Sequence, residues 1–225
     1  MNRNCLICMG QFTYGEIYKL QLCIPLNSSD NNQQPTPQPP QPNNSPKHTT
    51  SVTMAGTSLY DLIIPTFIKG LTTYDHVLAK AQEYAKEKGI NVDEFLEARL
   101  VEDQLPLSFQ VQNTSKVVQI TVGRLTGVDP TLLENTEKTV AELRTRVQKT
   151  LELVKAVKPE DVNSREEALI DLPWAGKTHQ VTVKHAVLTH GQTNFFFHLV
   201  TGYSILRAKG VPVGKADYLS SFLGL

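Results

Sequence analysis

The stretch KHAVLTHGQTNFFFHLVTGYSILRAK, residues 184–209, decides the fold of this chain. Its apolar residues recur at steps of three and four, which predicts a long helix with one buried side. The residues on that side are Leu188, Phe195, Leu199, Gly202, Tyr203 and Leu206. The same helix carries several polar and titratable groups, which are costly at core-facing positions unless they are paired or used. This helix is therefore the place to search for a site.

Three further segments show the same helical periodicity. They span residues 57–89, 106–125 and 139–157. Gly89 and Pro159 are typical residues for ending a helix, while Pro65 predicts a kink or a one-turn prelude inside the first segment. A short helical turn is expected over residues 92–99. Because each apolar stripe must be covered by the others, the pattern predicts an all-α four-helix bundle.

Two short segments before the last helix have strand character. Glu167–Leu172 and His179–Val183 are rich in apolar or β-branched residues, and they flank Pro173–Lys177, which suits a turn. The sequence therefore predicts a small β-hairpin at this place. Trp174 lies at its expected tip, where a solitary indole can mark a contact surface.

The first 53 residues differ in composition from the rest. Residues 27–53 are a tract of Asn, Gln, Pro, Ser and Thr that cannot bury enough apolar surface to offset the entropy of ordering. We expect residues 1–53 to be a disordered extension and residues 54–225 to be the folded domain. Cys5, Cys8 and Cys23 all lie in the extension, so the domain cannot depend on disulfides or thiolate-bound zinc.

Charge and hydropathy argue against several classes of partner. The chain has 22 Lys and Arg residues and 22 Asp and Glu residues, without the basic stripe that a nucleic-acid binder uses on phosphates. It also lacks the roughly 20 consecutive apolar residues that span a bilayer. We expect a cytoplasmic protein with neither a nucleic-acid nor a membrane partner. Phosphate loops, nucleophile elbows and HExxH helices are absent from the sequence.

His198 and Asn194 form the most suggestive pair on the last helix. They are four residues apart, the spacing at which two helical side chains can hold one ion. Zinc seldom takes a neutral amide, so Asn194 makes this a weak ligand set. His198 can instead be a histidine at the edge of the core, hydrogen-bonded to a facing helix, or an acid or base in a pocket. His185 and His190 are expected nearer the surface.

Five motifs together resemble a known family. They are Ser58–Leu62, Leu105–Val111, Ala141–Arg144, Asn194–His198 and Gly210–Asp217. In this order they are similar to a domain-of-unknown-function family of bacteria and fungi within the DinB/YfiT-like superfamily of metalloenzymes. The resemblance covers about Ala55 to Gly224.

The resemblance implies an up-down-down-up bundle. It also implies a metal held by a His of the second helix and an H-x-x-x-H pair of the last helix, and in some members a reaction with a low-molecular-weight thiol. Here only His198 matches this pattern, since Asn194 replaces the first His of the pair and no His lies between Pro106 and Leu125. No metal cofactor is therefore expected, with zinc or nickel as the alternative.

These observations lead to one preferred hypothesis and three alternatives. The preferred protein is a homodimer that acts as a small-molecule binding or interaction module with a degenerate metal site. Its candidate cavity residues are Tyr60, Gln110, Asn194, His198 and Tyr203, and its candidate catalytic residues are His198 and Asp103. The alternatives are a divergent metal-dependent thiol transferase or hydrolase that recruits Asp103 or His190, a metal-free acid-base catalyst using His198, and an oligomerising scaffold without a cavity.

Overall fold

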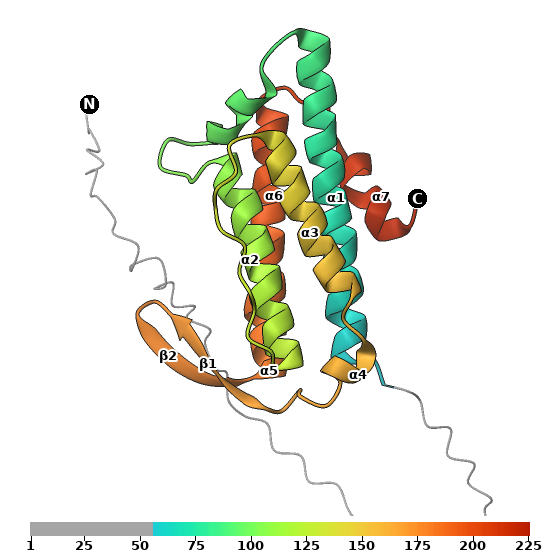
Figure 1. Cartoon of the computed structure of the whole chain (residues 1–225), viewed down its shortest axis with the longest axis vertical. Coiled ribbons are helices and arrows are strands. Elements are labelled where there is room, and N and C mark those ends of the chain that lie inside the picture. The colour runs from blue at the N-terminus through green and yellow to red at the C-terminus, as the bar shows by residue number, and fades with distance from the viewer. Residues whose placement is uncertain (1–55) are drawn as a thin grey trace, which may run out of the picture. The chain divides into compact units, whose positions relative to one another are not determined.

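The computed structural model describes residues 56–225 (Figure 1). The predicted disorder of residues 1–53 and the three cysteines lie outside this range. The elements in chain order are α1 (Leu59–Lys88), the 3₁₀ helix η1 (Val92–Glu97), α2 (Leu107–Thr126), α3 (Val140–Lys155), α4 (Pro159–Val162), β1 (Leu169–Trp174), β2 (Lys177–Thr182), α5 (Val183–His185), the π-helix η2 (Ala186–Gly191), α6 (Gln192–Ala208) and α7 (Lys215–Leu223).

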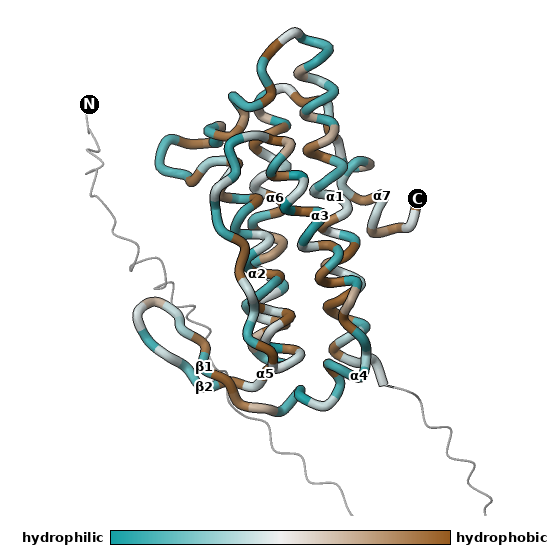
Figure 2. The backbone as a smooth tube through the Cα atoms, viewed as in Figure 1, coloured by the Kyte–Doolittle hydropathy of each residue, from teal (hydrophilic) through white to brown (hydrophobic). Residues whose placement is uncertain are grey.

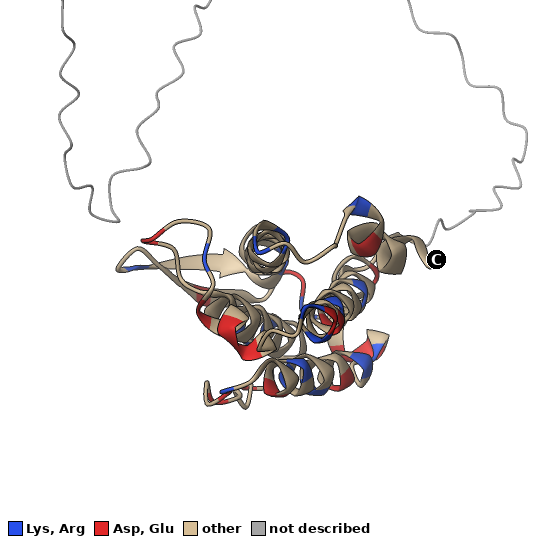
Figure 3. Cartoon of the chain, turned by 90° about the horizontal axis from the view of Figure 1, so that it is seen from above, with Lys and Arg blue, Asp and Glu red and all other residues tan. Residues whose placement is uncertain are grey.

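Four long helices, α1, α2, α3 and α6, form the bundle (Figure 1). α1 and α6 run in one direction and α2 and α3 in the other, so the order is up-down-down-up. The antiparallel hairpin β1–β2 precedes the last helices, with Leu169 paired to Thr182. The predicted fold class is confirmed. The helices alternate between polar and apolar stretches (Figure 2), and charges of both signs are interspersed over them (Figure 3).

Local signals explain the limits of α1. Ser58 and Asp61 form a capping box at its start, and Gly89 takes a left-handed conformation with φ of 65° at its end. The helix is continuous through Pro65, so the residues before Pro65 are part of α1 and do not form a separate helical turn. Pro65 lies in the second turn, where the carbonyl left without a partner is that of the exposed Asp61.

The last predicted helix is divided in the structure. In place of one helix over residues 184–209, residues 183–208 form α5, the π-helix η2 and α6 in succession. Helix α7, which packs against α1, was not predicted (Figure 1). Thr73 and Lys69 of α1 donate hydrogen bonds to the carbonyls of Tyr218 and Phe222, at 3.1 and 3.0 Å.

Close contact between α1 and α6 depends on two glycines placed opposite aromatic rings. Gly70 of α1 faces Phe195 of α6, whose ring would lie 2.5 Å from an added Cβ. In the second contact the glycine is on α6: Gly202 faces Tyr74 of α1, and an added Cβ would overlap the Tyr74 hydroxyl. Tyr74 is fully buried, and its hydroxyl has no hydrogen-bond partner among residues 56–225. Burial raises the pKa of that hydroxyl.

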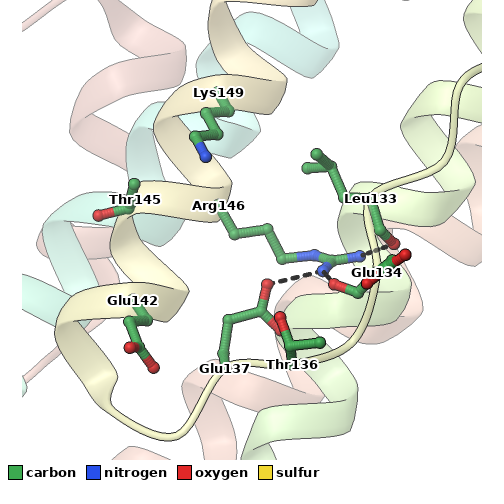
Figure 4. A pocket seen from close by; sticks show the side chains of 8 residues that line it. All are labelled: Leu133, Glu134, Thr136, Glu137, Glu142, Thr145, Arg146 and Lys149. Carbon is green, nitrogen blue, oxygen red and sulfur yellow. Dashed lines mark hydrogen bonds and ion pairs between the residues drawn. The ribbon is translucent and has the colours of Figure 1, made fainter.

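The crossover of residues 127–139 connects the parallel helices α2 and α3 and is fixed by one buried arginine. Arg146 of α3 donates hydrogen bonds to the carbonyls of Leu133 and Glu134, at 3.2 and 2.7 Å, and pairs with the Glu137 carboxylate at 2.7 Å (Figure 4). Burial raises the pKa of Glu137, but hydrogen bonds from Arg146 and Gln112 outweigh it, so the pKa lies below its usual value. A surface cleft of about 360 Å³ lies beside this group.

No helix among residues 56–225 combines the length and apolar character needed to cross a membrane. The homodimer and the cytoplasmic location stay predictions.

Candidate functional site

His198 lies on α6 between two carboxamide side chains of α2. The residue is 6% exposed. Nδ1 lies 2.8 Å from Oε1 of Gln110, and Nε2 contacts Nδ2 of Asn113. Phe109 and Phe197 place ring edges against the imidazole. Both ring nitrogens of His198 therefore have a partner, and we call this arrangement of Gln110, His198 and Asn113 the amide clamp.

The amide clamp selects one form of the imidazole. Gln110 uses its Nε2 to donate to the Leu105 carbonyl at 2.8 Å, so its Oε1 is free to accept from Nδ1–H of His198. Nε2 of His198 then accepts from the amide of Asn113. A proton on both ring nitrogens would leave one N–H facing an amide N–H. Burial lowers the pKa of His198 to about 4, which favours the same neutral form.

A small cleft adjoins the clamp. It has a volume of about 150 Å³ and lies between α2 and the η2–α6 segment. Its lining residues are Asn113, Lys116, Val117, Ile120, Thr121, Arg124, His190 and Asn194. Asn113 belongs to both the clamp and the cleft, so the cleft wall is held by the buried network behind it.

The π-helix η2 places His190 and Asn194 on this wall. A π-turn has i→i+5 hydrogen bonds and changes the direction in which the following side chains point. Gly191 at its end lies against Thr121 of α2, whose Oγ1 would be 2.6 Å from an added Cβ. A glycine at this position permits the close approach of the helix backbone to the Thr121 side chain. At the far end, the Trp174 indole lies edge-on to His190, with ring centroids 5.8 Å apart.

The structure brings together some of the predicted site residues and separates others. Gln110, His198 and Asn194 lie in or beside the clamp and cleft. Tyr60 lies at the start of α1, where its backbone N–H is 3.4 Å from Oδ1 of Asn163. Tyr203 packs on Tyr218 of α7, with ring centroids 5.6 Å apart.

The candidate acid Asp103 is exposed in the connector between η1 and α2. His185 is exposed, while His190 is half-buried and lines the cleft rather than lying free at the surface. Three further residues of the site, Asn113, Lys116 and Arg124, were not predicted. A signal was present, because polar residues interrupt the apolar stripe of residues 106–125.

The residues present do not fit the metal that the resemblance implies. Both ring nitrogens of His198 are engaged by carboxamides, which are neutral and weak ligands for zinc. Within residues 56–225, no three His, Cys, Asp or Glu side chains are grouped so that they could hold a metal ion. The arrangement can present hydrogen-bond donors and cations to a ligand.

The up-down-down-up bundle, with His198 on its last long helix, defines the protein as a DinB-like four-helix bundle. The family described as "Domain of unknown function (DUF1993)" matches residues 59–219, and the chain belongs to that family. A crystal structure of a DinB family member protein from Shewanella denitrificans is similar, with 35% sequence identity and a TM-score of 0.66. The match covers 72% of this chain and 91% of that chain. None of the curated proteins matches.

The amide clamp predicts a loss of stability in mild acid. The pKa of His198 is about 4 in the folded protein and about 6.5 in an unfolded chain, so the unfolded state binds more protons between these values. The contribution of the neutral His198 to the stability is fully present above about pH 6.5 and is lost as the pH drops toward about 4. From about pH 7.5 to about pH 5, His198 alone should remove about 2 kcal/mol, as measured by urea unfolding.

His198→Asn serves as the control for this prediction. The pKa of His190 is also lowered, first by burial and then by Arg124. Protonation of His190 therefore contributes to the loss of stability over the same pH range in both proteins. The variant should therefore retain a weaker pH dependence. Equal slopes in the two proteins would show that the clamp does not hold a neutral imidazole.

Proposed function

We propose that this protein binds a small molecule in the α2–α6 cleft, and that His198 supports the cleft wall instead of holding a metal. The observation that carries the proposal is the amide clamp. It occupies both nitrogens of the one histidine that matches the superfamily's ligand pattern, and it shares Asn113 with the cleft.

The lining of the cleft supports ligand binding over a purely structural role. Asn194 lines it, and the Asn194 side chain forms no hydrogen bond with another of residues 56–225, so its amide can serve a ligand. A bundle that acts only as a scaffold does not require polar side chains from two helices to line a cleft. Fixed polar groups in a concave site are instead typical of ligand recognition.

The state of His198 argues against a general acid or base. A catalytic group works best with a pKa near the operating pH, whereas the pKa of His198 is about 4. Both of its nitrogens already have partners within the protein. Substrate would have to displace Gln110 or Asn113 to reach either nitrogen.

A thermal-shift screen of metabolites and thiols tests the proposal. A ligand present at about 100 times its dissociation constant should stabilise the protein by about 2.7 kcal/mol. Asn194→Leu, which puts an apolar side chain into the cleft, should remove the shift. Thr193→Leu, at an exposed position next to it on α6, should keep the shift. If a ligand stabilises both variants equally, it binds elsewhere; if no compound shifts the wild-type protein, the proposal fails.

A further inference from the structure

Two cations lie on the same wall of the cleft. Lys116 and Arg124 are eight residues apart on α2, which places them about 12 Å apart along the helix axis. No Asp or Glu is among the cleft's lining residues. Within residues 56–225, neither cation forms a salt bridge. In a chain with equal numbers of acidic and basic residues, this cleft has a local excess of positive charge.

Arg124 differs from Arg146 and Arg144, the other buried or half-buried arginines of the long helices. Arg146 pairs with Glu137 at 2.7 Å, and the half-buried Arg144 pairs with Asp75 at 2.9 Å. Arg124 is also half-buried, yet its only side-chain partner within residues 56–225 is Nδ1 of His190 at 3.5 Å. Burial lowers the pKa of Arg124, which reflects the cost of a cation without a counter-charge. An anion supplied from solution would offset this cost.

The remaining groups suit an oxyanion as well. The amide of Asn194 can donate a hydrogen bond, and the planar guanidinium of Arg124 can bind two oxygens of a carboxylate or phosphate at once. The volume of about 150 Å³ is that of a cavity that can hold a molecule about the size of benzene. This space holds the charged head group of a ligand, while the rest of the ligand extends out of the cleft.

We infer that this cleft, to which the proposed function assigns a small molecule, binds the oxyanion group of that molecule, a carboxylate or a phosphate. Arg124 holds the oxygens at the His190 end, Lys116 supplies the second positive charge, and Asn194 donates to the bound group. The inference rests on the proposed function and adds the chemical class of the ligand.

Trp174 provides the measurement. It is the single tryptophan of the chain, it is 54% exposed, and its ring touches His190 at the end of the cleft. Its fluorescence should therefore change when a ligand binds beside Arg124. Chemical shifts of the Asn113 and Asn194 side-chain amides provide a second measurement that does not depend on the hairpin.

The experiment compares acetate with acetamide, which have nearly the same shape but differ in charge. Both are titrated at constant ionic strength into the full-length protein, and inorganic phosphate is titrated separately to distinguish carboxylate from phosphate recognition. At least one of the two anions should bind at least tenfold more tightly than acetamide. Arg124→Gln should weaken that binding at least tenfold, whereas Arg99→Gln, at an exposed site in the connector before α2, should leave it unchanged.

The outcomes separate this inference from the proposed function. If acetamide binds as well as the anions, or if Arg124→Gln binds them normally, the oxyanion assignment is wrong. In that case a metabolite whose thermal shift is lost in Asn194→Leu would still support a small-molecule cleft. If neither anion changes the Trp174 fluorescence or the amide shifts, the oxyanion assignment is also overturned, whatever the metabolite screen finds.

Discussion

Replacing Arg146 with methionine is expected to lower the free energy of unfolding by about 3–5 kcal/mol, because it leaves Glu137 without its buried partner. The Arg146 side chain is 2% exposed and that of Glu137 is 11% exposed, so water cannot replace the lost interaction well. The same change frees the carbonyls of Leu133 and Glu134. Chemical unfolding measures the loss, and hydrogen exchange should show it first in residues 127–139.

Arg144→Met is the matched control. Arg144 lies on the same helix and pairs with Asp75, but the two side chains are 28% and 24% exposed. Pairs accessible to solvent contribute about 1 kcal/mol or less. The double variant Arg146→Met with Glu137→Met should regain part of the stability, since no buried charge remains unpaired. Equal losses from the two single arginine variants would refute the role given to Arg146.

Gly202→Ala is expected to destabilise the protein by about 3 kcal/mol, at the upper end of what overpacking costs in a core. The added methyl group would overlap the hydroxyl of Tyr74, which is fully buried between α1 and α6. α1 and α6 would then have to move apart. Thermal or urea unfolding measures the effect. Gly56→Ala is the control, because nothing lies within 4 Å of its added Cβ.

Tyr74→Phe tests the same contact from the other helix. The Tyr74 hydroxyl is buried without a partner among residues 56–225, so its removal should stabilise the protein or leave it unchanged. It should also reduce the loss caused by Gly202→Ala, because the nearest clashing atom is gone. If the two substitutions add independently, the close contact between these residues is not the cause.

The four-helix bundle could be predicted because its apolar residues recur with helical periodicity and its helix ends carry local capping signals. The stripe from Leu59 to Ala85 and the capping boxes at Ser58 and Thr139 are local signals, and the structure places helices where they indicate. The π-helix η2 could not be predicted in this way. A π-turn keeps apolar residues at nearly the same steps, so the stretch around Gly191 reads as ordinary helix.

The site was predictable only in part for a related reason. His198 and Asn194 could be picked out because polar residues are conspicuous on an apolar helix. The partners of His198 come from α2, 85 to 88 residues earlier in the chain. Gln110 was predicted as a cavity residue, but no local pattern says that Gln110 and Asn113 will both contact the imidazole. Helix α7 was missed because it is only 9 residues long and follows Gly214, so the segment reads as an irregular C-terminal tail.

The amide clamp has a consequence for how the protein would respond to its surroundings. Carboxamides neither titrate nor undergo oxidation or reduction, and they hold the imidazole of His198 neutral at pH values well above 4. While the protein stays folded, the wall behind the cleft therefore keeps a constant charge through ordinary changes in acidity or redox potential. Acid therefore acts on the stability of the fold, through the unfolded state, and not on the charge that His198 contributes to the wall.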